Sequence, residues 1–188
     1  MFNFASFYLT ALKKNKEYII PFVGLKPGTH RYEFNLDTAF FAVQGIEEVS
    51  GAEVAAVLDF DKQDHLMTLH FDFEGWVLLT CDRCAGEYKQ PLSGKYRLIV
   101  KFGDQAEELS EELVVIGRDE YELDVSPYLY EFVRLLLPIK REHPVNESGQ
   151  SECDQEVIGA LDNLLVNTPE KEEETDPRWD ALKNLKWS

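Results

Sequence analysis

The stretch from Met67 to Cys84 reads MTLHFDFEGWVLLTCDRC. Its first half alternates strictly, with Met67, Leu69, Phe71 and Phe73 at every second position and polar residues between them. A period of two places the apolar side chains on one face of a strand. The strand runs directly into two cysteines that are separated by two residues, so the sequence predicts a β-hairpin with a pair of thiols at its turn.

The remaining patterns extend this hairpin into a sheet. Further strands are predicted over 17–23, 29–34, 52–61, 88–102 and 113–116, and a short helix over 40–46. After the last strand, Ser126 can act as an N-cap, and Pro127 can occupy the first helical turn, where its missing N–H costs nothing. Apolar residues then recur at helical spacing up to Pro138, which ends the helix.

These patterns predict an α+β protein: a mainly antiparallel β-sheet, or a partly closed barrel, with a packed helix after it and a C-terminal amphipathic helix. Residues 1–141 form the β-rich domain, and its covering helix lies near 127–137. Residues 142–175 are acidic and predict a partly disordered linker that contains one short helix around Val157, Leu161, Leu164 and Leu165.

Residues 176–188 predict a second amphipathic helix. Asp176 can cap it, Pro177 can start it, and Trp179, Leu182 and Leu185 line one side, while Arg178, Lys183 and Lys186 line the other. Such a helix either packs back on its own domain or folds into the groove of a partner, which a loose tether would allow.

The formal net charge of −16 is concentrated in two segments. Residues 104–124 carry −8 and residues 142–176 carry −10, which leaves +2 on the rest of the 188-residue chain. Two acidic stretches oppose a broad grip on nucleic-acid phosphates, so we expect weak or no direct binding of nucleic acid. The acidic runs are either solvated loops or docking surfaces for basic proteins.

Composition also bears on location and on chemistry. No apolar run approaches the roughly 20 residues that cross a bilayer, and the amino terminus does not read as a signal peptide. Three cysteines are too few for a secreted disulfide framework, so we expect a soluble, cytoplasmic protein without a membrane partner. The sequence has no glycine-rich phosphate loop, no GxSxG elbow and no HExxH pair, so catalysis is not expected.

Three interpretations of Cys81 and Cys84 stay open: a zinc site, a dithiol redox centre, or ordinary reduced cysteines. Redox motifs usually place the first cysteine at a helix N-terminus, whereas Cys81 follows a strand and precedes a turn, which disfavours that chemistry. Zinc needs four ligands. His143 and Cys153, behind the predicted helix, would complete a Cys3His set for a structural zinc ion.

Three short motifs, in this order and spacing, resemble the YceD family. They are the strand that leads into Cys81-Asp82-Arg83-Cys84, the segment from Leu123-Asp124-Val125-Ser126 through Glu131 to Leu136-Leu137-Pro138, and the final Asp176-Pro177-Arg178-Trp179-Asp180-Ala181-Leu182-Lys183-Asn184-Leu185. The resemblance covers most of the chain from about Gly51 onward.

The resemblance implies a non-enzymatic role in ribosome biogenesis, namely the accumulation of large-subunit ribosomal RNA. Many relatives carry a second cysteine group after the Leu-Pro element, and this chain departs from them by having only His143 and Cys153 there. We expect contacts with basic ribosomal proteins or another assembly factor, made by the acidic segments and by Asp176, Pro177, Arg178, Trp179, Leu182 and Leu185. The alternative function, of a different class, is that of a thiol-based redox enzyme or a metal-dependent sensor that uses Cys81 and Cys84.

Overall fold

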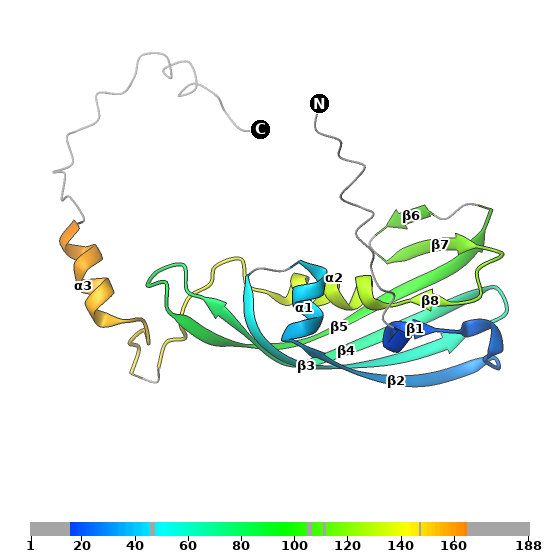
Figure 1. The fold of residues 1–188 in the computed structure, drawn as a ribbon, viewed down its shortest axis with the longest axis horizontal. Helices are drawn as coiled ribbons and strands as arrows, with labels where there is room; N and C mark the ends of the chain where they lie inside the picture. The colour runs from blue at the N-terminus through cyan, green and yellow to red at the C-terminus, as the bar shows by residue number, and fades with distance from the viewer. Residues whose placement is uncertain (1–15, 46–47, 105–106, 111, 147, 165–188) are drawn as a thin grey trace, which may run out of the picture.

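The computed structural model describes residues 16–45, 48–104, 107–110, 112–146 and 148–164 (Figure 1). Its strands are β1 (Ile19–Ile20), β2 (Gly28–Asp37), β3 (Val49–Lys62), β4 (Leu66–Thr80), β5 (Glu87–Gly103), β6 (Glu107–Ser110), β7 (Leu113–Gly117) and β8 (Leu123–Asp124). Its helices are α1 (Thr38–Gln44), α2 (Ser126–Leu136) and α3 (Gln155–Leu164), with 3-10 turns η2 (Lys16–Tyr18) and η3 (Phe22–Gly24).

The predicted hairpin, β4 and β5, lies at the centre of the main sheet. The two strands pair antiparallel from Leu66↔Lys101 to Thr80↔Glu87. Met67 and Leu69 are fully buried, whereas His70 is exposed on the opposite face. The alternation of the sequence therefore separates core from solvent as predicted.

Six strands form this sheet in the order β2-β3-β4-β5-β7-β6, and β1 pairs with β8 in a second sheet of two strands. All pairs are antiparallel except β5 with β7, which run parallel from Ile99↔Leu113 to Gly103↔Gly117. The outer strands β2 and β6 do not pair with each other in the described part of the chain. The α+β prediction is thus confirmed in its open-sheet form, and the partly closed barrel is not formed.

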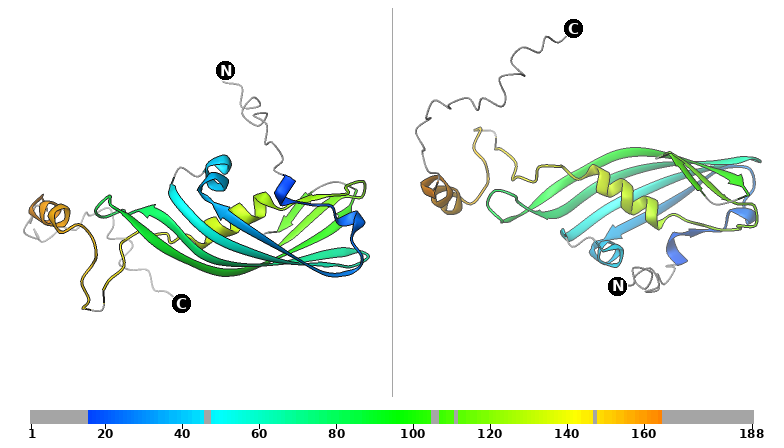
Figure 2. Two further views of the ribbon diagram at one scale, coloured as in Figure 1. Left: turned by 60° about the horizontal axis from the view of Figure 1, so that its bottom comes forward. Right: turned by 90° about the horizontal axis from the view of Figure 1, so that it is seen from above.

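Helices α1 and α2 lie on the same side of the curved sheet (Figures 1 and 2). The ring of Phe132 in α2 stacks on Tyr96 of β5 at 4.6 Å between centroids and meets Phe71 of β4 edge-on at 5.1 Å. Gly94 permits this close approach, because a Cβ there would overlap the side chain of Leu136. Each large apolar side chain buried in this way contributes about 1.5–3 kcal/mol to folding.

The strands predicted over 29–34, 52–61, 88–102 and 113–116 are all present, and α1 confirms the short helix. The strand predicted over 17–23 is wrong for most of its length: only Ile19 and Ile20 pair, with β8, and 3-10 turns flank them. Pro21 follows the pair directly and has no N–H to extend a ladder.

The predicted cap of α2 also needs correction. Val125 holds the N-cap position without a side-chain hydrogen bond, and Ser126 already belongs to the helix. The Oδ1 atom of Asp124 accepts hydrogen bonds from the backbone N–H of Ser126 at 2.9 Å and from its hydroxyl at 2.7 Å. An Asx turn at Asp124 therefore leads into the helix. In such a turn the aspartate side chain accepts a hydrogen bond from the backbone N–H two residues later.

Beyond α2 the chain returns to the turn between β4 and β5 and then forms α3, which lies beyond the end of that hairpin (Figures 1 and 2). Helix α3 occupies the position of the short helix predicted near Val157. None of the described helices has the length and apolar character needed to cross a bilayer. The helix predicted over 176–188, with its six proposed contact residues, lies outside the described residues.

Candidate metal centre

The turn between β4 and β5 places two thiols side by side. The N–H of Cys81 donates to the carbonyl of Gly86 at 2.8 Å, and the N–H of Ala85 donates to the carbonyl of Cys81 at 2.9 Å. Ala85 has a φ of 57°, in the left-handed region, which tightens the turn. The N–H of Arg83 approaches Cys81 Sγ at 3.4 Å. These contacts fold the turn into a knuckle that carries Cys81 and Cys84.

The segment after α2 is held against this knuckle by paired backbone contacts. The N–H of Asp82 donates to the carbonyl of Arg141 at 2.7 Å, and the N–H of Arg141 donates to the Asp82 carboxylate at 2.9 Å. The Arg141 guanidinium lies 3.7 Å from Asp82 and 3.4 Å from Glu48. This docking brings His143 and then Cys153 to the knuckle.

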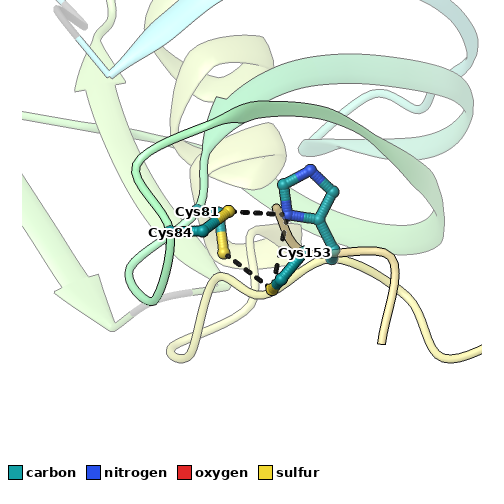
Figure 3. A group of neighbouring side chains, drawn as sticks. Cys81, Cys84 and Cys153 are labelled. Carbon is teal, nitrogen blue, oxygen red and sulfur yellow. Dashed lines mark hydrogen bonds between the residues drawn. The ribbon is translucent and has the colours of Figure 1, made fainter. Parts of the chain in front are cut away.

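The four predicted ligands meet: the Sγ atoms of Cys81, Cys84 and Cys153 and a ring nitrogen of His143 all lie within 4.8 Å of one another. The separation is 3.8 Å from Cys81 Sγ to Cys153 Sγ. His143 Nδ1 lies 3.4 Å from Cys84 Sγ and 3.7 Å from Cys153 Sγ. The three labelled cysteines in Figure 3 point toward one another from the knuckle and from the later segment.

These separations can be compared with a tetrahedral zinc site. Bonds of about 2.3 Å to sulfur and about 2.0–2.1 Å to nitrogen give edges of about 3.8 Å between two sulfurs and about 3.6 Å between sulfur and nitrogen. The three measured edges agree with these values within about 0.2 Å. The other three separations are at most 4.8 Å. The donor set of three thiols and one imidazole therefore fits zinc in chemistry, and half of its separations already match a tetrahedral site.

Burial and hydrogen bonding set the protonation of the thiols. Cys81 is 2% exposed, and this burial raises the pKa of its thiol, but backbone N–H groups of the turn and contacts with His143 together lower it to about 6. For Cys153, a hydrogen bond with Ser151 lowers the pKa, and burial with the neighbouring thiols outweighs it, so that pKa is raised. A thiolate that forms readily inside such a cluster is the form that binds metal.

Three further side chains support the site and were not predicted. Asp82 and Arg141 join its two halves, as described above, and Tyr88 of β5 lies against the His143 ring at 5.2 Å between centroids. Tyr88 could have been found from the sequence, because it is the first inward-facing residue of the strand that follows the knuckle. The link between Asp82 and Arg141 carried none, because it joins residues 59 apart in the chain.

Two surface pockets, of about 650 and 440 Å³, lie elsewhere on the described structure, and no residue of the cluster lines either one. The first contains Phe22 and Phe102 near the turn between β3 and β4, and the second contains Tyr96 and Phe132 beside α2. The thiols therefore do not face either pocket.

The fold and the site define an α+β protein with an open sheet and a closed Cys3His corner. The family model described as large ribosomal RNA subunit accumulation protein YceD matches residues 69–186. The chain belongs to the YceD family, and the matched range includes the whole Cys3His cluster. Comparison with the curated proteins and with the solved structures found no match.

Proposed function

We propose that this chain is a non-enzymatic factor of ribosome biogenesis that acts in the cytoplasm through protein contacts and promotes accumulation of large-subunit ribosomal RNA. The family match over residues 69–186 carries this proposal. A corner whose four ligands are all protein side chains leaves no open position for a substrate, which supports a structural rather than a catalytic role for it.

The acidic segment around β6 and β7 supports a basic protein as partner. Around β6 and β7, two cations are already paired: Arg97 with Glu112 at 2.6 Å and Arg118 with Asp104 at 3.3 Å. The exposed carboxylates of Asp119 and Glu120 make no ion pair with the described residues. Basic ribosomal proteins, or another assembly factor with a basic surface, would complement this charge.

The proposed contact residues at the carboxyl end are Asp176, Pro177, Arg178, Trp179, Leu182 and Leu185. Their apolar members would fit a partner's groove as a short amphipathic helix, and Arg178 would help to orient it. Because phosphate binding needs clustered Lys and Arg, direct affinity for RNA is expected to be weak and to disappear as salt is raised.

We also propose that Cys81, Cys84, His143 and Cys153 hold one structural zinc ion. The three separations that match a tetrahedral site support this assignment. Zinc would supply a crosslink between the β4–β5 turn and the segment that leads into α3, and binding would contribute directly to folding of that corner.

The ribosomal role is tested by depleting the protein and recording a ribosome profile. Loss of large subunits, restored by the full chain, is the expected result. A chain that lacks residues 176–188 should restore them less well and should lose a co-purifying basic partner. A normal profile after depletion would end the proposal.

Zinc is tested by metal analysis of protein purified without chelators. We expect about one equivalent in the parent and a large loss in Cys81→Ser, because three ligands hold zinc far less tightly than four. Less than about half an equivalent in the parent, or no loss in the variant, would contradict the four-ligand site.

One observation favours a second candidate, a thiol-based redox enzyme or a metal-dependent sensor: the pKa of Cys81 is lowered to about 6, so its thiolate is available near neutral pH. The 2% exposure of Cys81 opposes it, because an attacking thiolate must reach its substrate. Rapid alkylation of Cys81 in the zinc-loaded chain, together with a normal ribosome profile, would favour this candidate.

A further inference from the structure

Helix α3 has an apolar stripe that the core covers only near the helix start. Val157 packs against the core and Ile158 is 9% exposed, whereas Leu161 and Leu164 are 43% and 75% exposed. Residues three and four apart share one face of a helix, so these side chains form one stripe. Figures 1 and 2 show no other described helix or strand beside α3. The second half of the stripe is therefore an uncovered apolar surface.

The surroundings of this stripe are acidic. Glu152, Asp154, Glu156 and Asp162 are all exposed on α3 or just before it. From residue 142 to residue 164 the sequence contains no Lys or Arg. A segment that covers the stripe would therefore bind best if it carried apolar side chains at helical spacing beside positive charges.

Such a segment follows in the same chain. Within residues 176–188, Trp179, Leu182 and Leu185 recur every third residue, next to the cations Arg178, Lys183 and Lys186. The charge and the spacing both complement α3. A helix over 176–188, as the spacing predicts, would present this apolar side to α3.

The connecting length permits the contact. Eleven residues separate Leu164 from Asp176. When extended they reach about 36 Å, which is more than twice the length of about 15 Å of a ten-residue helix, so the segment can run back along α3. A tether of this kind gives an effective concentration of about 1 mM, so even a weak contact is populated.

We propose that residues 176–188 dock in the free chain on the exposed end of the α3 stripe, with Trp179 against Leu161 and Leu164. This inference concerns the free chain and does not depend on the ribosomal role. A partner that uses the same apolar side chains must displace them from α3. The contact would thus keep Trp179 and its neighbours away from unrelated proteins until the partner binds.

The test uses Trp179 as the reporter in the full-length chain. Trp76→Phe and Trp187→Phe leave it as the single tryptophan, and acrylamide quenching then measures its exposure. We expect quenching about threefold weaker than for a free indole, as a mostly docked segment requires. Leu161→Ser with Leu164→Ser should restore full quenching, and both positions are already exposed, so the fold should tolerate the change. The matched control Asn163→Ser, on the far side of α3, should leave quenching unchanged.

Each other outcome overturns the proposal. Full quenching in the parent would show that the segment does not dock. Weak quenching that the two serines leave unchanged would show that it docks elsewhere. Protection that disappears on dilution would show that the segment covers α3 of a second copy. Because quenching is measured without any ribosomal component, none of these results bears on the ribosomal role.

Discussion

At the scale of single residues, the knuckle depends on side chains that would not themselves bind the metal. Asp82 joins the knuckle to the later segment through its backbone N–H and its carboxylate, both of which contact Arg141. Replacing a group that orients a metal ligand typically lowers metal affinity by about 10- to 100-fold. Asp82 is therefore expected to act as a positioning residue for His143.

Replacing Asp82 with alanine should weaken zinc binding by about tenfold or more, because the segment that carries His143 loses its carboxylate anchor. Competition against a chromophoric chelator measures this affinity. Arg83→Ala is the matched control, since Arg83 also lies between the two cysteines but its side chain makes no hydrogen bond or ion pair with the described residues. Equal affinity in Asp82→Ala and Arg83→Ala would remove Asp82 from this role.

Tyr18 provides a pH prediction away from the thiols. Its ring packs between Phe34 and Phe40, and burial, with smaller effects of Glu17 and Asp37, raises the pKa of its phenol from 10.0 to about 12. Between these values the unfolded chain releases the proton and the folded chain keeps it. The unfolded state then binds fewer protons, so stability falls as pH rises from 10 to 12.

Tyr18→Phe removes this one titration. We expect the free energy of unfolding to fall by about 2 kcal/mol less in the variant than in the parent across that interval. Urea unfolding at a series of pH values measures the difference. Parallel slopes in the two proteins would show that the phenol does not titrate abnormally.

At the scale of the elements, the long β4–β5 hairpin determines where everything else packs. Each of its two strands contains a glycine that allows another element to approach closely. Gly94 of β5 lies under Leu136 of α2, and Gly75 of β4 lies beside the backbone of β3. A Cβ at Gly75 would lie 2.7 Å from Val54 Cα, and backbone cannot move aside as a flexible side chain can. The close pairing of β4 with β3 at this position therefore requires a residue without a side chain.

Gly75→Ala should destabilise the protein by about 3 kcal/mol, the upper range for overpacking a close contact. Thermal and urea unfolding measure this change. Gly24→Ala is the control, because nothing lies within 4 Å of a Cβ there and its φ is not positive. The control should shift stability by no more than about 0.5 kcal/mol. A similar loss in both variants would show that the close contact at Gly75 is not the cause.

At the scale of the whole molecule, the sheet domain and the segment that ends in α3 are held together differently. The sheet, α1 and α2 share one hydrophobic core. The later segment reaches that core mainly through Cys153, Val157 and Ile158, next to the proposed zinc. We therefore expect the corner to position α3 and the sheet to fold without it.

Removal of zinc should accordingly loosen one part of the molecule only. With a chelator present, hydrogen exchange should accelerate in residues 141–146 and in α3, because the crosslink that holds them is lost. Exchange in β3 and β4 should change little. Cys81→Ser should reproduce the pattern without a chelator. Equal acceleration throughout the sheet would show that the metal supports the whole fold.

The sequence by itself determined much of this protein. Strict alternation from Met67 to Phe73 placed the core face of β4, and helical spacing before Pro138 placed α2. The residue types of the CxxC pair, His143 and Cys153 named four side chains that the fold brings together. These signals are local: a period of two or of 3.6 and the chemistry of a side chain are written into neighbouring residues.

Only the tertiary structure decided the rest. The 3-10 turns around Ile19, the parallel addition of β7 to β5, and the open edge between β2 and β6 all depend on which strand lies beside which. The meeting of Cys84 with His143 depends on the contact between Asp82 and Arg141, far apart in sequence. Such pairings have no periodic signal, because they arise from the three-dimensional packing of segments that are each compatible with several neighbours.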